Sequence, residues 1–286
     1  MTEHSSQAGA GVESLAQRHL VEETFHDEKA YVGAPPARTD FYPEWMADEH
    51  MQMLLQGAGP LAGKRVLDFG CGRGESGRIY AQQGAVRVEG FDISGENIAI
   101  ANKNAKRDGL DQRVFFRRLA AEEIDYPNGS FDVVIGKAIL HHTELEKTAW
   151  QLERVLAPGG VAVFLEPLAH NPILNFFRRL TPSRRTPTEK PLSLKDLEIF
   201  RRHFGCVTYR GFYLFTLVSH FLLLVTGSRS LFAKSRALMR RWEEPVLVRF
   251  PRLQRYCWSA LVLFRKSGGE PRTADWPAGQ IQVELS

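Results

Sequence analysis

Five short apolar segments recur between residues 66 and 166, with helix-like stretches between them. The segments are VLDFG (66–70), VRVEGFD (86–92), RVFFRR (113–118), FDVVIG (131–136) and VAVFLE (161–166). Their length and their β-branched and aromatic residues indicate strands. Strands that alternate with helices predict an α/β fold with a mostly parallel sheet and helices on both faces.

Capping residues mark the expected helix boundaries in this region. Ser94 opens a helix that is expected to reach Gly109. Thr143 and Glu146 form the pattern of a capping box, with Thr143 at the N-cap, for a helix that ends at Pro158-Gly159-Gly160.

Further strands and helices are expected after residue 166. A short helix covers 171–180, and Ser193 caps another. CVTYR (206–210) and YCWSALVLFRK (256–266) would be strands six and seven. The insert between these strands, 211–255, is longer than the connection that a compact sheet requires.

The insert 211–255 combines an apolar stretch with a basic one. GFYLFTLVSHFLLLVT has eleven large apolar residues in sixteen, fewer than the roughly 20 of a membrane-spanning helix. One predicted helix then carries Arg229, Lys234, Arg236, Arg240 and Arg241. This pattern is typical of a segment in an anionic membrane interface. The alternative is a helix buried over the active site, and either arrangement favours an apolar pocket beneath it.

Charge is divided unevenly along the chain. Residues 178–266 carry 19 Lys and Arg against 5 Asp and Glu, whereas residues 1–177 carry 17 against 25. Only the later part therefore calls for an anionic partner. Nucleic acid is the less favoured partner, because the basic residues alternate with apolar runs and no nucleic-acid motif is present.

Cysteine usage and the N-terminus favour a cytoplasmic protein, peripherally bound to membrane if the insert docks there. Cys71, Cys206 and Cys257 form neither a disulfide framework nor a four-ligand zinc site. MTEHSSQAGAGVES lacks the basic and apolar regions of a secretory signal.

A glycine-rich turn follows the first strand, in the segment DFGCGRG (68–74). Such a turn lets the backbone approach a ligand at the start of a helix, beyond the carboxyl ends of the strands. Gly72 to Gly77 match the GxGxxG dinucleotide pattern, with Asp92 available for a ribose. However, Asp68 precedes the turn, and an acid there suits a cationic ligand better than a pyrophosphate.

Four motifs together resemble the class I S-adenosylmethionine (SAM)-dependent methyltransferases. They are VLDFGCGRG, GFDIS, FDVVIGKAILHH and LERVLAPGGVAVFLEP, which occur in the family's order within residues 65–167. The small-molecule branch that contains quinone-biosynthesis methyltransferases is the nearest resemblance. The resemblance implies a Rossmann-like, seven-stranded sheet whose last strand is antiparallel, with SAM as cofactor.

The resemblance also assigns the residues that contact the methionine and nucleoside parts of the cofactor. Asp68 would hold the methionine ammonium, directly or through water. Asp92 would accept both ribose hydroxyls, and Ile93 would pack on the adenine. Backbone contacts and space would come from Gly70, Cys71, Gly72 and Gly74.

The resemblance places the contacts to the adenine after the third strand and those to the sulfonium after the fourth. The family often has Asp after strand three, but Ala120 stands there. Ala121 or Glu122 would therefore contact the adenine, and Gly136 and Lys137 would border the sulfonium.

Histidines are the candidates for a general base. Methyl transfer needs the acceptor positioned near the methyl carbon, and a base helps when the acceptor is a hydroxyl. His141 and His142 follow strand four and His170 follows strand five, with His26 a further candidate. No metal is expected, because the acids of HHTELE fit the first turn of a helix better than a metal site.

These observations predict methylation of a hydrophobic small molecule such as a lipid, quinone or terpenoid, with O-methylation preferred. The alternatives are a polar or natural-product acceptor with 211–255 as a lid, and a non-catalytic SAM-fold protein that binds membrane or a partner. The expected organisation is a tail and helical cap (1–60), a SAM-binding core (61–168), a region that completes the sheet (169–266) and a flexible tail (267–286).

Overall fold

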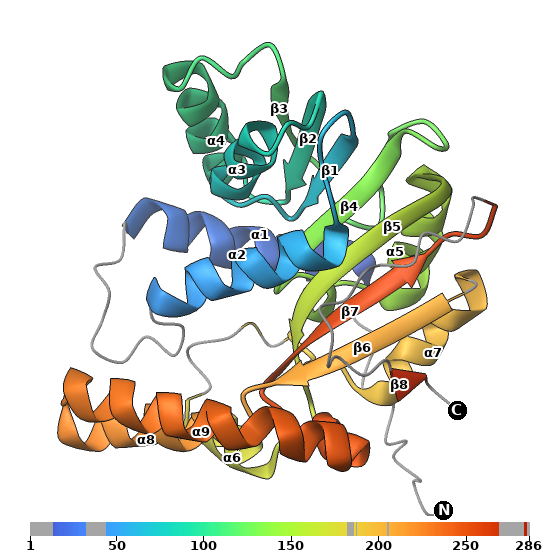
Figure 1. The fold of residues 1–286 in the computed structure, drawn as a ribbon. Helices are drawn as coiled ribbons and strands as arrows, with labels where there is room; N and C mark the ends of the chain where they lie inside the picture. Colours follow the sequence, from blue (N-terminus) through green and yellow to red (C-terminus); the bar gives the residue numbers. More distant parts are fainter. Residues whose placement is uncertain are drawn as a thin grey trace, which may run out of the picture.

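The strands of the protein form one mixed sheet (Figure 1). The computed structural model describes residues 14–32, 44–181, 186, 188–204, 206–268 and 283–284. The strands are β1 (Arg65–Phe69), β2 (Arg87–Asp92), β3 (Val114–Arg118), β4 (Phe131–Lys137), β5 (Leu156–Pro167), β6 (Cys206–Phe212), β7 (Ser259–Arg265) and β8 (Val283–Glu284).

The order of the strands is β3-β2-β1-β4-β5-β7-β6-β8. The first five are parallel, and β7 inserts antiparallel between β5 and β6. This arrangement confirms the expected Rossmann-like fold. The short β8, which pairs with Thr208 and Tyr209 of β6, is an addition that the sequence did not indicate. β2, the next strand along the chain, pairs with one side of β1, and β4 pairs with the other side. This reversal of the strand order opens a crevice between the carboxyl ends of β1 and β4.

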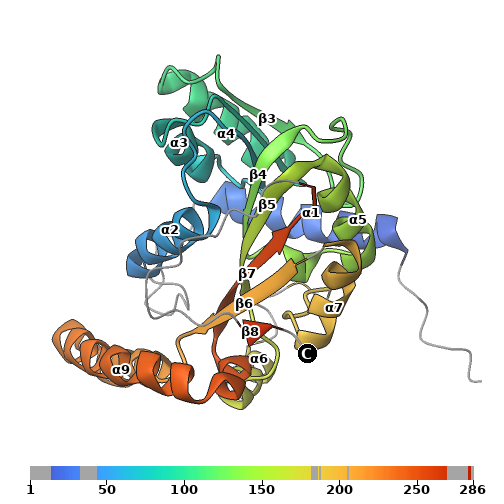
Figure 2. The same ribbon diagram turned by 45° about the vertical axis from the view of Figure 1, so that its right-hand side comes forward.

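Helices cover both faces of the sheet (Figures 1 and 2). They are α1 (Leu15–Val32), α2 (Glu44–Ala58), α3 (Glu75–Gln82), α4 (Gly95–Arg107), α5 (Leu145–Val155), α6 (Pro172–Leu180), α7 (Leu194–His203), α8 (Thr216–Thr226) and α9 (Arg229–Arg249), with short 3₁₀ turns η1 (Leu140–His142) and η3 (Pro251–Tyr256).

Alternate residues of the strands point to two apolar cores. Val66 and Val133 pack with Leu54 of α2 and Tyr80 of α3 on one face. Phe164 and Val134 pack with helices α5 and α7 on the other. Burial of these side chains fixes the register of the sheet, and with it the positions of the loops at its carboxyl edge.

The start of α5 differs from the sequence prediction. Glu144, not Thr143, is the N-cap, and its carboxylate accepts from the amides of Glu146 and Lys147. The Thr143 hydroxyl instead donates to the carbonyl of Leu140 and closes the η1 turn. The helix also ends earlier than expected, at Val155, because the chain turns extended at Leu156 and begins β5. Ser94 and Ser193 cap their helices as predicted.

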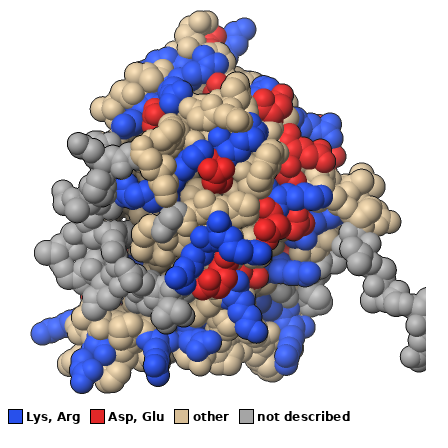
Figure 3. Space-filling view, turned by 90° about the vertical axis from the view of Figure 1, so that its right-hand side faces the viewer, with Lys and Arg blue, Asp and Glu red and all other residues tan. Residues whose placement is uncertain are grey.

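Helices α6, α8 and α9 gather at one end of the molecule, beyond the ends of β6 and β7 (Figures 1 and 2). A third apolar cluster, which includes Leu174 of α6 and Leu217 of α8 with Tyr213 and Trp258, attaches α6 and α8 to the sheet. The same end is the lower edge of Figure 3, where Lys and Arg alternate with uncharged residues. The insert 211–255 is therefore a pair of packed helices followed by η3. No helix of the described residues is both long and apolar enough to cross a membrane.

Candidate functional site

The glycine-rich turn after β1 requires glycine for two separate reasons. Gly70 has φ of 73° and lies so close to Ile139 that an added Cβ would be 2.8 Å from its Cγ1. Gly72 has φ of 52° but faces open space, with no atom within 4 Å of an added Cβ. Gly70 therefore allows close packing, and Gly72 exposes its backbone to a ligand.

The carboxylate of Asp92, at the end of β2, is fixed by backbone amides. Gly72 donates to its Oδ2 and Ser94 to its Oδ1, each at 3.0 Å. The side chain of Asn97 donates to Oδ1 at 3.4 Å. Because a carboxylate has about four acceptor positions and three donors are present, Asp92 can still accept one hydroxyl group from the pocket.

Asp68 is buried at the base of the turn. It is 4% exposed, and its Oδ2 has no hydrogen-bond partner among the described residues. Burial raises the pKa of Asp68 to about 7, despite a hydrogen bond from the backbone of Gly77, and the charge of Asp92 adds to the rise. An orphaned buried carboxylate oxygen is costly, and a cationic ligand group would relieve that cost.

A pocket of about 200 Å³ opens between these loops and α1. Of the residues predicted from the sequence, it is lined by Gly70, Gly72, Asp92, Ile93, Ala121, Glu122, Lys137 and His142, and also by His26. Further lining comes from His19, Glu22, Phe91, Asn97, Leu119, Ala138, Ile139 and Thr143.

Four predicted cofactor contacts, Asp68, Cys71, Gly74 and Gly136, fall outside this lining. Cys71 is buried, with its thiol 3.7 Å from the carbonyl oxygen of Gly72, and burial raises its pKa well above the ordinary value. Gly74 packs against Phe116, and an added Cβ at Gly136 would be 2.3 Å from the ring of Phe164. These residues shape the loops rather than the pocket wall.

Glu122 is already engaged by protein groups. Its Oε1 accepts from the amide of Glu144 at 2.6 Å, and its Oε2 lies 3.1 Å from Nε2 of His19. Its side chain therefore joins the loop after β3 to α5 and to α1.

The two adjacent histidines after β4 have different surroundings. Nδ1 of His141 lies 2.7 Å from Oε2 of Glu166, whose other oxygen accepts from the amides of Ile139 and Leu140. His141 and Glu166 are buried and hold the η1 turn. His142 lines the pocket, with its Nδ1 3.0 Å from Oε2 of Glu22.

His170 does not line this pocket, contrary to its predicted role. Its Nε2 accepts from the amide of Leu194 at the start of α7. Burial lowers its pKa, and the charge of Arg255 lowers it further. The segment after β5 pairs with Leu192 through Leu168, which directs His170 toward α7.

Helix α1 closes the pocket through polar contacts. Arg18 donates to the carbonyl oxygens of His142 and Thr188, and Glu23 pairs with Arg118. Asp27 accepts from Ser94. α1 therefore contacts the loops after β2, β3 and β4 together. The N-terminal segment thus forms the cover expected from the sequence, although residues 33–43 lie outside the described part.

Comparisons with known proteins agree with this geometry. Residues 66–160 match the family model described as a methyltransferase domain. The chain contains a class I SAM-dependent methyltransferase domain. SAM is the cofactor of this class, and the orphaned oxygen of Asp68, the exposed backbone of Gly72 and the remaining acceptor position of Asp92 suit its ammonium and hydroxyl groups.

Relatives of the methyltransferase domain include two named O-methylation enzymes. The 27-O-demethylrifamycin SV methyltransferase of Amycolatopsis mediterranei is 43% identical over 108 residues, which are 37% of this chain and 40% of that protein. A ubiquinone biosynthesis O-methyltransferase of Rhizobium etli is 34% identical over 162 residues, 51% of this chain and 64% of that protein. The chain thus spans about two fifths to two thirds of their lengths.

Solved structures share the fold of the methyltransferase domain at low sequence identity. The [4+2]-cyclase SpnF has a TM-score of 0.57 and 21% identity, covering 88% of this chain and 97% of that structure. The geranyl diphosphate C-methyltransferase of Streptomyces coelicolor has a TM-score of 0.61 and 14% identity, covering 90% and 100%. These likenesses concern the fold alone.

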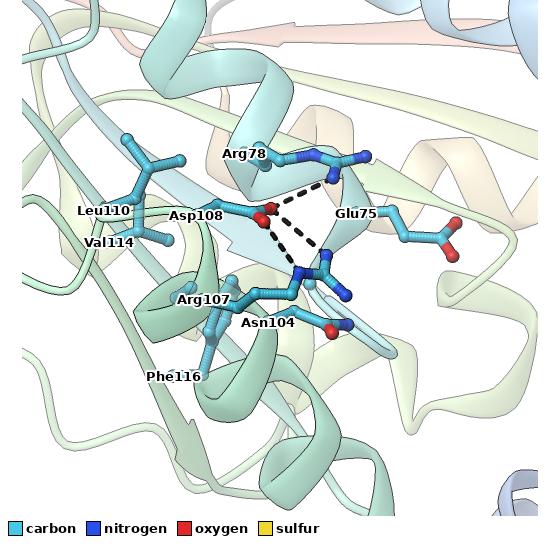
Figure 4. Close-up of a pocket in the computed structure, with 10 residues that line it drawn as sticks. Glu75, Arg78, Asn104, Arg107, Asp108, Leu110, Val114 and Phe116 are labelled. Atoms are coloured by element: carbon cyan, nitrogen blue, oxygen red, sulfur yellow. Dashed lines mark hydrogen bonds and ion pairs between the residues drawn. The ribbon is translucent and has the colours of Figure 1, made fainter.

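A second hollow lies between α3 and α4, and its lining includes Glu75, Arg78 and Asn104 (Figure 4). Asp108 binds Arg78 at 3.0 Å and Arg107 at 2.9 Å there. Because these charges satisfy one another, the pocket beside Asp92 is the better ligand site.

Proposed function

We propose that the protein transfers the methyl group of SAM to a hydrophobic small molecule, with an oxygen atom as the preferred acceptor. The observation that carries the proposal is the single pocket that Gly72, Asp92 and His142 line together. A histidine beside the acceptor can take the proton of a hydroxyl group. The relatives named for O-methylation support the same preference.

We propose SAM contacts residue by residue on the same grounds. Asp68 faces the ammonium, Asp92 the ribose and Ile93 the adenine, while Lys137 borders the sulfonium. Ala121 lines the pocket beside the adenine position. When bound, SAM supplies an already activated methyl group, and the task of this chain is to orient the acceptor and exclude water.

We further propose that the acceptor is taken from an anionic membrane surface. Large apolar side chains lie exposed on the three helices at the lower end of Figure 1: Ile173, Phe176 and Leu180 on α6, Val218, Phe221, Leu224 and Val225 on α8, and Leu231, Leu238 and Trp242 on α9. An exposed apolar surface of this kind marks an interaction site.

The charges of α9 favour a bilayer as the partner of this surface. Arg229, Lys234 and Arg241 are exposed and have no ion pair with any described residue. Cationic side chains beside exposed apolar ones suit anionic lipid headgroups above an acyl layer. Acceptors dissolved in that layer would reach the enzyme without crossing water.

The first test incubates the protein with methyl-labelled SAM and whole-cell extract, then partitions the products between organic solvent and water. Label in the organic phase supports a lipid-like acceptor. Label only in water would make α8 and α9 a lid over a polar or natural-product acceptor. If SAM binds but no label is transferred from any extract, the non-catalytic alternative takes precedence. An Asp92→Ala variant run in parallel identifies transfer that depends on the pocket.

A further inference from the structure

Glu22 belongs to α1, outside the sheet, yet its carboxylate is buried against the turn that follows β4. It is 4% exposed, and its Oε2 lies 3.0 Å from Nδ1 of His142. Neither atom has an aligned hydrogen-bond partner elsewhere among the described residues. Two buried polar atoms at this distance satisfy each other after a small rotation of the ring, and catalytic hydrogen bonds are often poorly aligned before substrate binds.

The other oxygen of Glu22 is held in place. Thr186 donates its hydroxyl to Oε1 at 2.7 Å, and Thr188 donates to the same oxygen. Burial alone would raise the pKa of Glu22, but His142 and these two hydroxyls lower it to about 2. The carboxylate is therefore ionised at neutral pH, with one oxygen anchored and the other directed at the imidazole.

A carboxylate beside Nδ1 determines what the far side of the imidazole can do. It favours the tautomer with the proton on Nδ1, which leaves Nε2 as an acceptor, and it stabilises the imidazolium that forms when Nε2 takes a proton. We propose that Glu22 is the positioning residue of an acid–base pair with His142, supplied by α1. This inference rests on the proposed function, because it assigns His142 a proton-transfer task there.

The proton balance of this pair is simple. One proton moves from the acceptor's oxygen to Nε2 of His142 while that oxygen forms its bond to the methyl carbon. SAM, when bound, supplies the methyl group and retains the electron pair of the broken carbon–sulfur bond. Glu22 stays ionised throughout, and the proton passes from His142 to water after product leaves.

Other titratable and charged groups face His142. His26 of α1 has its ring centroid 5.5 Å away, and His141 has its centroid 4.2 Å away. One potential ligand atom each from His141, His142 and Glu189 lie within 4.8 Å of one another. Arg18 contacts the carbonyl oxygen of His142. Of the described carboxylates, Glu22 lies nearest the imidazole of His142, at 3.0 Å from Nδ1.

The test measures the tautomer of His142 directly, in the full chain labelled with ¹⁵N-histidine. A His142→Asn variant assigns the resonance among the nine histidines. Replacing the carboxylate by an amide with Glu22→Gln should weaken the preference of His142 for the Nδ1–H tautomer. Glu28→Gln, at an exposed position of the same helix, is the matched control and should leave that preference unchanged.

An unchanged tautomer of His142 in folded Glu22→Gln would overturn the inference, whether or not an acceptor has been found. If an acceptor is found, the same variant should move the acidic limb of the pH–rate profile to lower pH, and Glu22→Asp should restore part of the rate. A metal control uses the same spectra, because Glu22, His26 and His142 also bring three donor atoms within 4.8 Å. If one equivalent of Zn²⁺ shifts His26 and His142 together, the three residues form a metal site and the acid–base assignment fails.

Discussion

The amide of Gly72 donates a hydrogen bond to Oδ2 of Asp92 at 3.0 Å, which joins the turn after β1 to the end of β2. A second amide, that of Ser94, holds the other oxygen. The carboxylate is thus fixed before any ligand arrives, and little conformational entropy remains to be lost when it binds one.

Replacement of Asp92 by alanine should weaken SAM binding by more than tenfold, because the ribose of the ligand loses a charged acceptor. Isothermal titration calorimetry measures the affinity, and circular dichroism checks that the fold survives. Asp111→Ala, at an exposed position before β3, should bind SAM normally. Equal affinities for the two variants would refute the assignment of the ribose contact.

Replacement of Gly136 by a larger residue should destabilise the fold more than the same replacement at an ordinary glycine of the domain. A Cβ there would lie 2.3 Å from Phe164, whose ring is fully buried, so Gly136→Ala should destabilise the fold by about 1–3 kcal/mol. Gly95→Ala is the control, since its Cβ would meet its nearest atom at an ordinary 3.8 Å. Urea denaturation measures both, and a Gly136→Ala protein as stable as the parent would contradict the packing described here.

The raised pKa of Asp68 predicts a pH-dependent stability without ligand. Its native pKa is about 7, above the ordinary value of 3.8, so between these values the native state binds more protons than the unfolded state. This group's contribution to the free energy of unfolding should therefore fall as pH rises from about 4 to 7, by at most roughly 1.4 kcal/mol per pH unit.

Asp68→Asn removes this titration while keeping nearly the same shape. Urea unfolding between pH 4.5 and 7.5 should show that the parent loses stability relative to Asp68→Asn across that range. A constant difference between the two proteins would mean that Asp68 titrates normally in the fold.

The sequence was sufficient to predict features that depend on neighbouring residues. Strands β1 to β5 and the turn around Gly72 are each determined by short runs of apolar residues or glycines. Asp92 was predictable because β2 must lie beside β1, which brings its end to the same edge of the sheet. Thr143 was mistaken because one hydroxyl has two local uses, and the carbonyl of Leu140 competes successfully with the start of α5.

Long-range side-chain pairs left no comparable signal. Glu22 reaches His142 only because α1 packs across the carboxyl ends of the strands. The residues of neither segment indicate that packing. The helical spacing of Glu22 and His26, four residues apart on one face, was the available hint. His170 illustrates the converse, because a position after β5 satisfied the pattern while the local pairing of Leu168 directed its ring elsewhere.

The surface formed by α6, α8 and α9 predicts binding to anionic vesicles. Trp242 on α9 is 60% exposed beside cationic residues, and its indole is suited to the interface between headgroups and acyl chains. Trp242→Ala should weaken binding to vesicles of phosphatidylcholine with phosphatidylglycerol by about fivefold or more. Sedimentation of the vesicles measures the bound fraction.

Trp150→Ala is the matched control, because Trp150 is 52% exposed but belongs to α5, outside the three helices of that surface. It should bind vesicles like the parent protein. Binding should also fall with added salt and on pure phosphatidylcholine, since part of the attraction is electrostatic. If the parent does not bind anionic vesicles, or both tryptophan variants lose binding equally, α8 and α9 are better explained as a lid, and the acceptor must reach the pocket from water.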